Sequence, residues 1–254
     1  MKLFKAEFQR NFYTYIKNKK TTILSLIIFI TIISITLNIY NHRFDEVGDI
    51  GALIIGTVYL IRLSLSSLIF PTSQVIEYLK KNNIDTTINN NYFNLETILL
   101  IRSIFALFFN TLMALSFVIL LDIFNSDLLN ESFKNYFMIF LIGFIGAIGI
   151  VGLGLVILSL VWKLSINMPV VLLSQILLIL LIFSTPIDSS FIPFSDTKIF
   201  IINIFNGYDP SIKLFLEYLV KILTNSVFYL LLGYYTLKFT RVKITSKKIK
   251  EWEE

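Results

Sequence analysis

Long and nearly uninterrupted runs of apolar residues dominate this chain. A helix that crosses a hydrocarbon core of about 30 Å needs roughly 20 such residues, whereas the strands of a membrane barrel alternate over about ten. Six runs have that length and predict helices at Thr21–Tyr40, Ile50–Ile76, Glu96–Leu121, Tyr136–Trp162, Pro169–Thr185 and Ile212–Phe239. The expected fold is therefore an all-α polytopic membrane protein. Its single membrane domain would comprise residues 1–20, a six-span bundle at 21–240 and a basic tail at 241–254.

The first twenty residues have a different pattern from the spans. On a helix Phe4, Phe8, Phe12 and Tyr15 share one face, and basic side chains such as Lys5 lie largely on the other. This pattern predicts an amphipathic helix at 1–20 that lies in the membrane interface. It would serve either as an anchor for the first span or as a lever that links the spans to a cytoplasmic partner.

The connection between the fifth and sixth spans, Asp188–Lys213, is polar at both ends but holds the apolar stretch Ile199–Phe205. Ser195 is a candidate N-cap, and Asn206 followed by Gly207 is a candidate helix stop. The pattern favours a short external, half-buried helix, with an extended loop as the alternative.

Composition and charge support membrane insertion and set the orientation. Hydrophobic residues make up 56% of the 254 residues and charged residues 15%, with a mean hydropathy of +0.76. Lysine and arginine are concentrated in the two terminal segments and at Lys80, Lys81 and Lys163, which predicts that both termini are cytoplasmic. The net charge of +5 therefore indicates contact with anionic lipid, and no nucleic-acid partner is expected. The frequent Ile, Asn and Lys residues are typical of AT-rich bacterial genomes, so we expect a bacterial plasma membrane protein.

Several kinds of site are excluded or disfavoured. The chain has no cysteine, which excludes disulfides and thiolate metal sites, and its only histidine, His42, lies in a polar linker without candidate partners. No metal site is expected, and a membrane-embedded acyltransferase or protease would need clustered catalytic groups. No phosphate-binding loop motif is present, so we expect no catalytic residues and no cofactor bound by this chain.

Small residues in the fourth predicted span indicate close helix packing. Gly143, Gly146, Gly149 and Gly152 recur at three-residue spacing, and small residues on one face let two helices approach closely in lipid. The packing partner could lie in the same chain or across a dimer.

Charged and polar residues inside the spans have a cost in lipid and call for a partner. Arg62 lies deep in the second span near several serines, and Glu217 and Lys221 are four residues apart and are expected to pair. The candidates for a transport pathway or for helix pairing are Arg62, Ser66, Gln175, Glu217, Lys221 and Asn225. Structural pairing and snorkelling to the interface are the alternative for these groups.

A final set of residues carries a resemblance to a known family. A glutamate, Glu77, closes the second span, a polar segment at Tyr78–Asn91 follows, and Arg102 opens the third span. Together with the amphipathic N-terminus, this order resembles the type-2 ATP-binding-cassette transporter permeases, and most of all the small permeases of bacteriocin or lantibiotic immunity and of peptide export. The residues that the resemblance assigns to ATPase coupling are Phe4, Phe8, Phe12, Glu77, Tyr78, Lys80, Lys81, Asn82 and Arg102.

The resemblance implies a permease subunit that works with cytoplasmic ATP-binding subunits, which would hold ATP and Mg, and with a second permease copy, identical or different. It also implies that the helix near Ile199–Phe205 is a lid over the outer end of the pathway. The exported compound would be a peptide, an antimicrobial or another amphipathic compound such as a lipid-like drug. The alternatives are an ion-coupled secondary carrier, which should have broken helices near the midplane, or a non-transporting membrane scaffold. From the residues alone, the polar segment at Tyr78–Asn91 could equally be an ordinary solvated loop.

Overall fold

The computed structural model describes residues 8–9, 13, 55–69, 95–124, 133–164, 173–178 and 192–253, and these residues form helices and turns without any strand. Its elements are a helix at Ile55–Ile69, α5 at Leu95–Phe124, α6 at Phe133–Leu164, α8 at Ser195–Phe205 and α9 at Ile212–Glu253. Residues 173–178 are also helical. The all-helical fold class is thus confirmed for the described part of the chain.

Three of these helices are long and apolar enough to cross a membrane. They cover Glu96–Leu120, Phe133–Leu160 and Ile212–Thr240, close to the limits predicted for the third, fourth and sixth spans. The second and fifth predicted spans are described only at 55–69 and 173–178, and the first, Thr21–Tyr40, lies outside the described residues. The tail predicted after residue 240 continues α9 as one 42-residue helix.

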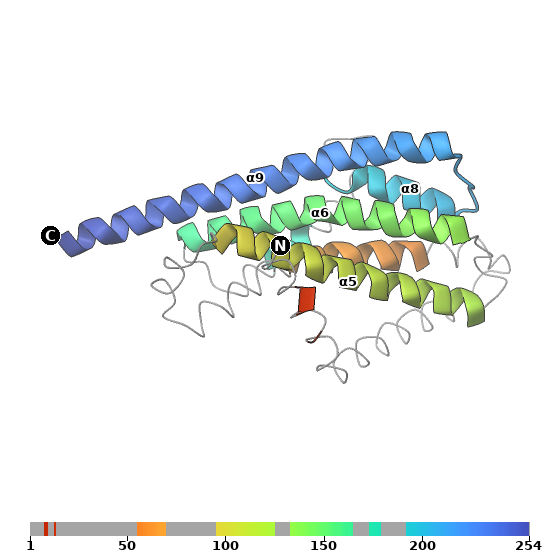
Figure 1. The fold of residues 1–254 in the computed structure, drawn as a ribbon, viewed down its shortest axis with the longest axis horizontal. Helices are drawn as coiled ribbons and strands as arrows, with labels where there is room; N and C mark the ends of the chain where they lie inside the picture. Colours follow the sequence, from red (N-terminus) through yellow and green to blue (C-terminus); the bar gives the residue numbers. More distant parts are fainter. Residues whose placement is uncertain are drawn as a thin grey trace.

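The long helices α6 and α9 lie side by side and run in the same direction, whereas α5 runs in the opposite direction (Figure 1). Glycines set the closest approach between α6 and α9. A Cβ atom on Gly152 would collide with the backbone of Tyr229 and lie 2.6 Å from the nitrogen of Leu230. Gly233 of α9 likewise faces the backbone of Gly152. The two helices therefore meet backbone to backbone, as small residues allow in lipid.

Aromatic side chains join α5 to α6. The ring of Phe108 lies 5.9 Å from that of Phe140 and 5.8 Å from that of Phe144, both in edge-to-face geometry, and Phe140 stacks on Phe144. Such pairs contribute about 0.5–1.5 kcal/mol beyond their burial. This cluster fixes the antiparallel pair to which the other described helices attach.

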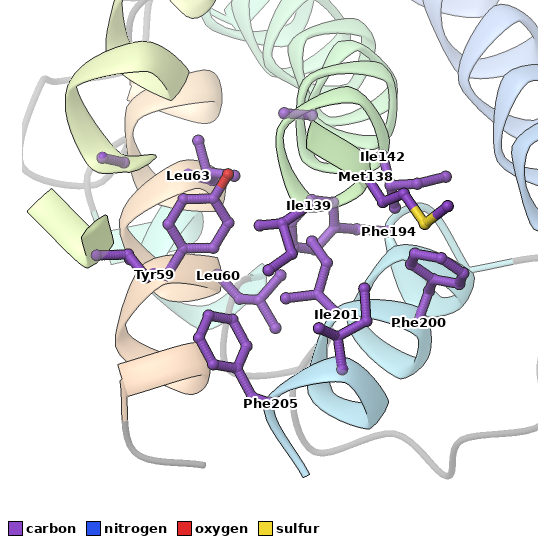
Figure 2. Packing of buried hydrophobic residues seen from close by; sticks show 14 of the residues in the cluster. Tyr59, Leu60, Leu63, Met138, Ile139, Ile142, Phe194, Phe200, Ile201 and Phe205 are labelled. Atoms are coloured by element: carbon purple, nitrogen blue, oxygen red, sulfur yellow. The ribbon is translucent and has the colours of Figure 1, made fainter. Parts of the chain in front are cut away.

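The short helix α8 is part of the core, in contrast to the half-buried surface helix expected from the sequence. Phe200, Ile201, Ile204 and Phe205 are buried, and Figure 2 shows several of them among Tyr59, Leu60 and Leu63 of the helix Ile55–Ile69 and Ile139 and Ile142 of α6. A Cβ atom on Gly56 would lie 2.6 Å from the Phe205 ring. The apolar face of α8 thus fills the space between the helix Ile55–Ile69 and α6.

The sequence analysis predicted the C-terminal end of α8 correctly but not its N-terminal cap. Asn206 is the C-cap and Gly207 has φ of 80°, and their amides donate to the carbonyls of Ile202 and Ile204 at 2.9 Å each, so the predicted stop is confirmed. The predicted N-cap was wrong. Ser195 is the first helical residue, and the cap is Phe194, which has φ of 74° and makes no side-chain cap hydrogen bond. The first turn is instead held by the Ser195 amide, which donates to the carbonyl of Ile192.

Candidate functional site

An ion pair lies at one end of the two parallel helices α6 and α9. Depth along these helices is measured from this ion pair below. The Nζ of Lys134, at the start of α6, donates to Oδ1 of Asp209, just before α9, at 2.7 Å. Both side chains are largely exposed. Ser211 then caps α9 by accepting a hydrogen bond from the Leu214 amide at 3.3 Å. Residues of α6 and α9 that follow can be placed by their distance from this Lys134–Asp209 end.

The first turn of α8 lies far from that end. Thr197 packs directly against Gly146, so closely that a Cβ atom on Gly146 would overlap the Thr197 hydroxyl. Gly146 is about 13 residues into α6, which corresponds to roughly 20 Å at 1.5 Å per residue. From this level the chain returns toward Asp209 through α8, whose 11 residues span about 16 Å. Therefore α8 is a re-entrant helix relative to the candidate span Phe133–Leu160, and its N-terminus lies level with the middle of that span.

A narrow crevice separates this first turn from α9. Its lining contains Ile192, Phe194, Asp196, Thr197, Ile222, Asn225 and Ser226, and it is too tight to admit a water molecule. Ser226 is at the middle of the candidate span Ile212–Thr240 and packs against Gly149 of α6. The crevice is therefore a polar contact at mid-depth in two candidate spans, which is where polar groups in membrane proteins most often serve function.

Asp196 is the charged residue of the crevice lining, and it forms no ion pair with another residue in the described part of the chain. The positive charge of Lys221 on α9 acts on the Asp196 carboxyl. Lys198, which follows on α8, is buried. The Nζ of Lys221 lies 5.5 Å from the centroid of the Tyr218 ring, a cation–π contact.

The residues predicted for a pathway fall into two groups. Asn225 lines the crevice, and Lys221 lies one turn before it. Ser66 donates to the carbonyl of Leu63 at 3.0 Å, Arg62 is half-buried, and Gln175 is fully buried and donates through Nε2 to the carbonyl of Leu68 at 3.3 Å. These three belong to the helix Ile55–Ile69 and its neighbour at 173–178, and none of them lines the crevice.

The predicted ion pair within the sixth span is absent between these two described residues. Glu217 is exposed, and the ammonium group of Lys221 turns to the Tyr218 ring and to the side of α9 that Asp196 approaches. Spacing by four residues allows an ion pair on an isolated helix, but the Lys221 ammonium group instead contacts the ring of Tyr218, three residues before it on α9. The described contact of Lys221 is therefore with Tyr218 and not with Glu217.

The glycines predicted for helix packing contact three different elements. A Cβ atom on Gly143 would lie 2.9 Å from the Tyr59 hydroxyl, and Gly146 faces Thr197 of α8. Gly149 and Gly152 face α9. One stripe of small residues thus accommodates the helix Ile55–Ile69, α8 and α9 along α6.

The residues assigned to ATPase coupling are described in part. Phe8 is helical and packs on α5, with its ring 5.7 Å from that of Phe105 and 5.6 Å from that of Phe109. Arg102 is buried near the start of α5, as is Glu96. The other predicted coupling residues, Phe4, Phe12, Glu77, Tyr78, Lys80, Lys81 and Asn82, lie outside the described residues.

The sequence analysis did not single out Asp196, Thr197 or Ser226 as site residues. Asp196 and Thr197 were placed in an external connection, and Ser226 follows Asn225 within an otherwise apolar span. The glycine stripe showed where α6 could be approached, but nothing local identified α8 as the element that approaches it. Among the described residues no group of three or more His, Cys, Asp or Glu side chains could hold a metal ion.

Comparisons of the chain with protein-family models, with curated proteins and with solved structures gave no match. The site must therefore be interpreted from its own geometry and chemistry.

Proposed function

We propose that this chain is the membrane-spanning permease subunit of an ATP-driven transporter, in which separate cytoplasmic subunits hydrolyse ATP. The observation that carries this proposal is the attachment of the N-terminal segment to α5 through Phe8. Such an attachment favours the lever over the simple anchor, because a lever must be fixed to a span that it can move.

The contact is specific in geometry. Phe8 meets Phe105 edge to face and Phe109 at a tilt, and Phe105 is buried. Two aromatic pairs of this kind contribute about 1–3 kcal/mol together beyond simple burial. A displacement of Phe8 would therefore be transmitted to α5, since breaking both contacts has a comparable cost.

The contacts continue into the bundle. The residue next to Phe109 is Phe108, whose ring packs on Phe140 and Phe144 of α6, and α6 in turn meets α8 and α9 through its glycines. A continuous packed route thus leads from the N-terminal segment to the crevice. In the proposed mechanism the ATP-bound partner prefers one position of Phe8, and this preference shifts the population of bundle conformations.

The remaining parts of the proposal rest on the sequence analysis alone. The protein would lie in a bacterial plasma membrane with both termini in the cytoplasm and pair with a second permease subunit. It would export a peptide, an antimicrobial or another amphipathic compound. The Lys134–Asp209 end would then face outward, and α8 would enter the membrane from that side.

The test is co-purification of the full chain with its partner from native membranes, followed by an ATPase assay on the complex. Phe8→Ala should leave the complex less able to couple ATP hydrolysis to peptide export. Tyr13→Ala is the matched control, because the Tyr13 side chain is 67% exposed. Recovery of the chain without any ATP-binding subunit, or equal export by Phe8→Ala and the parent, would refute the proposal.

One observation favours the second candidate, an ion-coupled carrier. Carriers bind ions and substrates at the termini of half-helices near the bilayer midplane, and α8 is such a half-helix beside the middle of two candidate spans. Transport that persists without ATP-binding subunits and follows a proton or sodium gradient would establish this function instead.

A further inference from the structure

The helix α9 has two opposite faces, and only one of them packs on the other described helices. That face meets α6 through Ser226 and Gly233, and Ile222 and Leu237 on the same side are buried. Within the most apolar part of each span, 11% of α9 is buried, compared with 50% of α5 and 61% of α6. Figure 1 shows α9 along one edge of the described helices. The second face of α9 must therefore be covered by lipid or by another chain.

The uncovered face carries a seven-residue repeat. Exposed residues recur on it at alternating intervals of three and four residues, and we call them the repeat face of α9: Glu217, Val220, Thr224, Val227 and Leu231. This spacing keeps a row of side chains in contact along two helices that wrap around each other. The hydroxyl of Thr224 donates to the carbonyl of Val220 at 2.8 Å, so this small residue needs no polar partner outside the helix. A small residue of this kind favours helix packing in lipid.

Two charged residues at one end of this face have no partner within the described structure. Lys213 and Glu217 are both exposed, and neither forms an ion pair in the described part of the chain. The ammonium group of Lys221 is in contact with the Tyr218 ring instead. Glu217 lies about 8 Å inside the start of the candidate span Ile212–Thr240. A carboxylate at this depth is unfavourable against lipid tails unless a cation lies beside it.

We propose that the repeat face of α9 is the surface through which two identical copies of this chain associate in the membrane. Both copies insert with the same orientation, because their lysine and arginine distribution is the same. The two-fold axis therefore runs along the membrane normal, and the two α9 helices are parallel. In a parallel pair with this repeat, Glu217 packs beside Lys213 of the second copy, and symmetry forms this pair twice. The inference rests on the second subunit of the proposed function and identifies it as an identical copy.

Charge complementarity favours an identical copy over the other two occupants. Two carboxylates and two ammonium groups meet in a neutral cluster, whereas lipid tails offer a counter-charge to neither sign. A different subunit would need matching charges of its own, whereas this chain already carries both signs four residues apart on one helix face. The opposite face of α9 is occupied by α6, so association through the repeat face leaves the described bundle unchanged.

The first test uses the natural absence of cysteine from the chain. Val227→Cys places a thiol on the repeat face, and Leu232→Cys places one about 140° around the same helix. The two parent side chains are 44% and 40% exposed, so both thiols face the surface of the monomer. The full-length variants are reconstituted in liposomes and oxidised with copper phenanthroline. Val227→Cys should form covalent dimers at least about tenfold faster, because a disulfide requires its two Cβ atoms within about 4.5 Å.

Charge reversal tests the ionic pairing independently. Glu217→Lys makes two symmetry-related attractive pairs repulsive, and should weaken self-association by about tenfold, measured by FRET between labelled copies at increasing lipid-to-protein ratio. Adding Lys213→Glu to Glu217→Lys restores opposite charges and should recover the parent value, which a general folding defect would not allow. Lys134→Glu is the matched control, because it reverses an exposed charge on α6 and should leave self-association unchanged.

Equal cross-linking of Val227→Cys and Leu232→Cys would overturn the proposal, and so would a double reversal that fails to recover association. A chain that stays monomeric at every lipid ratio would assign the repeat face to lipid. A chain that dimerises only with a different permease subunit would assign it to that subunit, and either result refutes the identical copy. Nucleotide and ATP-binding subunits are absent from these measurements, so co-purification of an ATP-binding subunit would uphold the proposed function even where this interface fails.

Discussion

Gly152→Ala tests whether α6 and α9 are in backbone contact. The added methyl group would overlap the Tyr229 carbonyl and approach the Leu230 nitrogen to 2.6 Å, whereas ordinary carbon contacts are about 3.5–4.0 Å. Both obstacles belong to the backbone of a long helix and cannot rotate away. The helices must therefore separate by about 1 Å locally, and a gap of that size forfeits a quarter to a half of each contact along the seam.

We expect Gly152→Ala to lower the free energy of unfolding by about 2–3 kcal/mol, the upper part of the range for overpacking substitutions. Gly149→Ala is the graded control on the same helix. Its methyl group would lie 3.2 Å from the Cα of Ser226, so shifts of a few tenths of an ångström suffice. Its cost should remain below about 1 kcal/mol.

The measurement is reversible unfolding of both purified variants in mixed micelles with increasing SDS, followed by circular dichroism and tryptophan fluorescence. Equal free energies of unfolding for Gly152→Ala and Gly149→Ala would refute the backbone contact between α6 and α9 at Gly152. A destabilisation of Gly149→Ala that exceeds that of Gly152→Ala would require a different rotation of α9 about its axis.

Two smaller effects follow from the same structure. Lys134→Ala removes an exposed ion pair and should lower the unfolding free energy by less than about 1 kcal/mol, with the difference vanishing at high salt; a loss of several kcal/mol in the SDS titration would show that the pair is buried by a partner. Gly207→Ala meets no neighbouring atom but imposes φ of 80° on a residue with a Cβ atom, so its cost should be about 1–2 kcal/mol from backbone strain alone. A Gly207→Asn variant tolerates that conformation better and should recover part of the loss in the same assay.

The spans could be predicted because their signal is local. The runs at Glu96–Leu120, Phe133–Leu160 and Ile212–Thr240 are apolar over the full length of a bilayer, and lipid requires backbone hydrogen bonds within each segment. The helix stop at Asn206 and Gly207 was also predicted correctly, since a left-handed residue after a helix depends on residues nearby. The N-cap was missed because Phe194 has an unusual conformation, which no residue type at that position indicates.

The depth of α8 had no local signal. Its polar first turn and the apolar stretch Ile199–Phe205 fit a helix on the surface as well as a helix within the bundle, and only the space beside Gly143 and Gly146 of α6 decides between them. The same holds for Lys221, whose spacing from Glu217 suggested an ion pair within α9. Tertiary packing brings Asp196 from α8 and orients Tyr218, and these neighbours determine where the charge lies.

The sequence by itself thus determined that the chain forms long apolar helices, that three apolar spans lie close to Glu96–Leu120, Phe133–Leu160 and Ile212–Thr240, and that α6 carries a face of small residues. Only the tertiary structure decided which helices use that face, and that α8 brings Asp196 and Thr197 to the middle of the α6–α9 pair. The physical reason is that helix formation in lipid follows from hydrogen bonding within a segment, whereas a buried polar site depends on contacts between segments far apart in the chain.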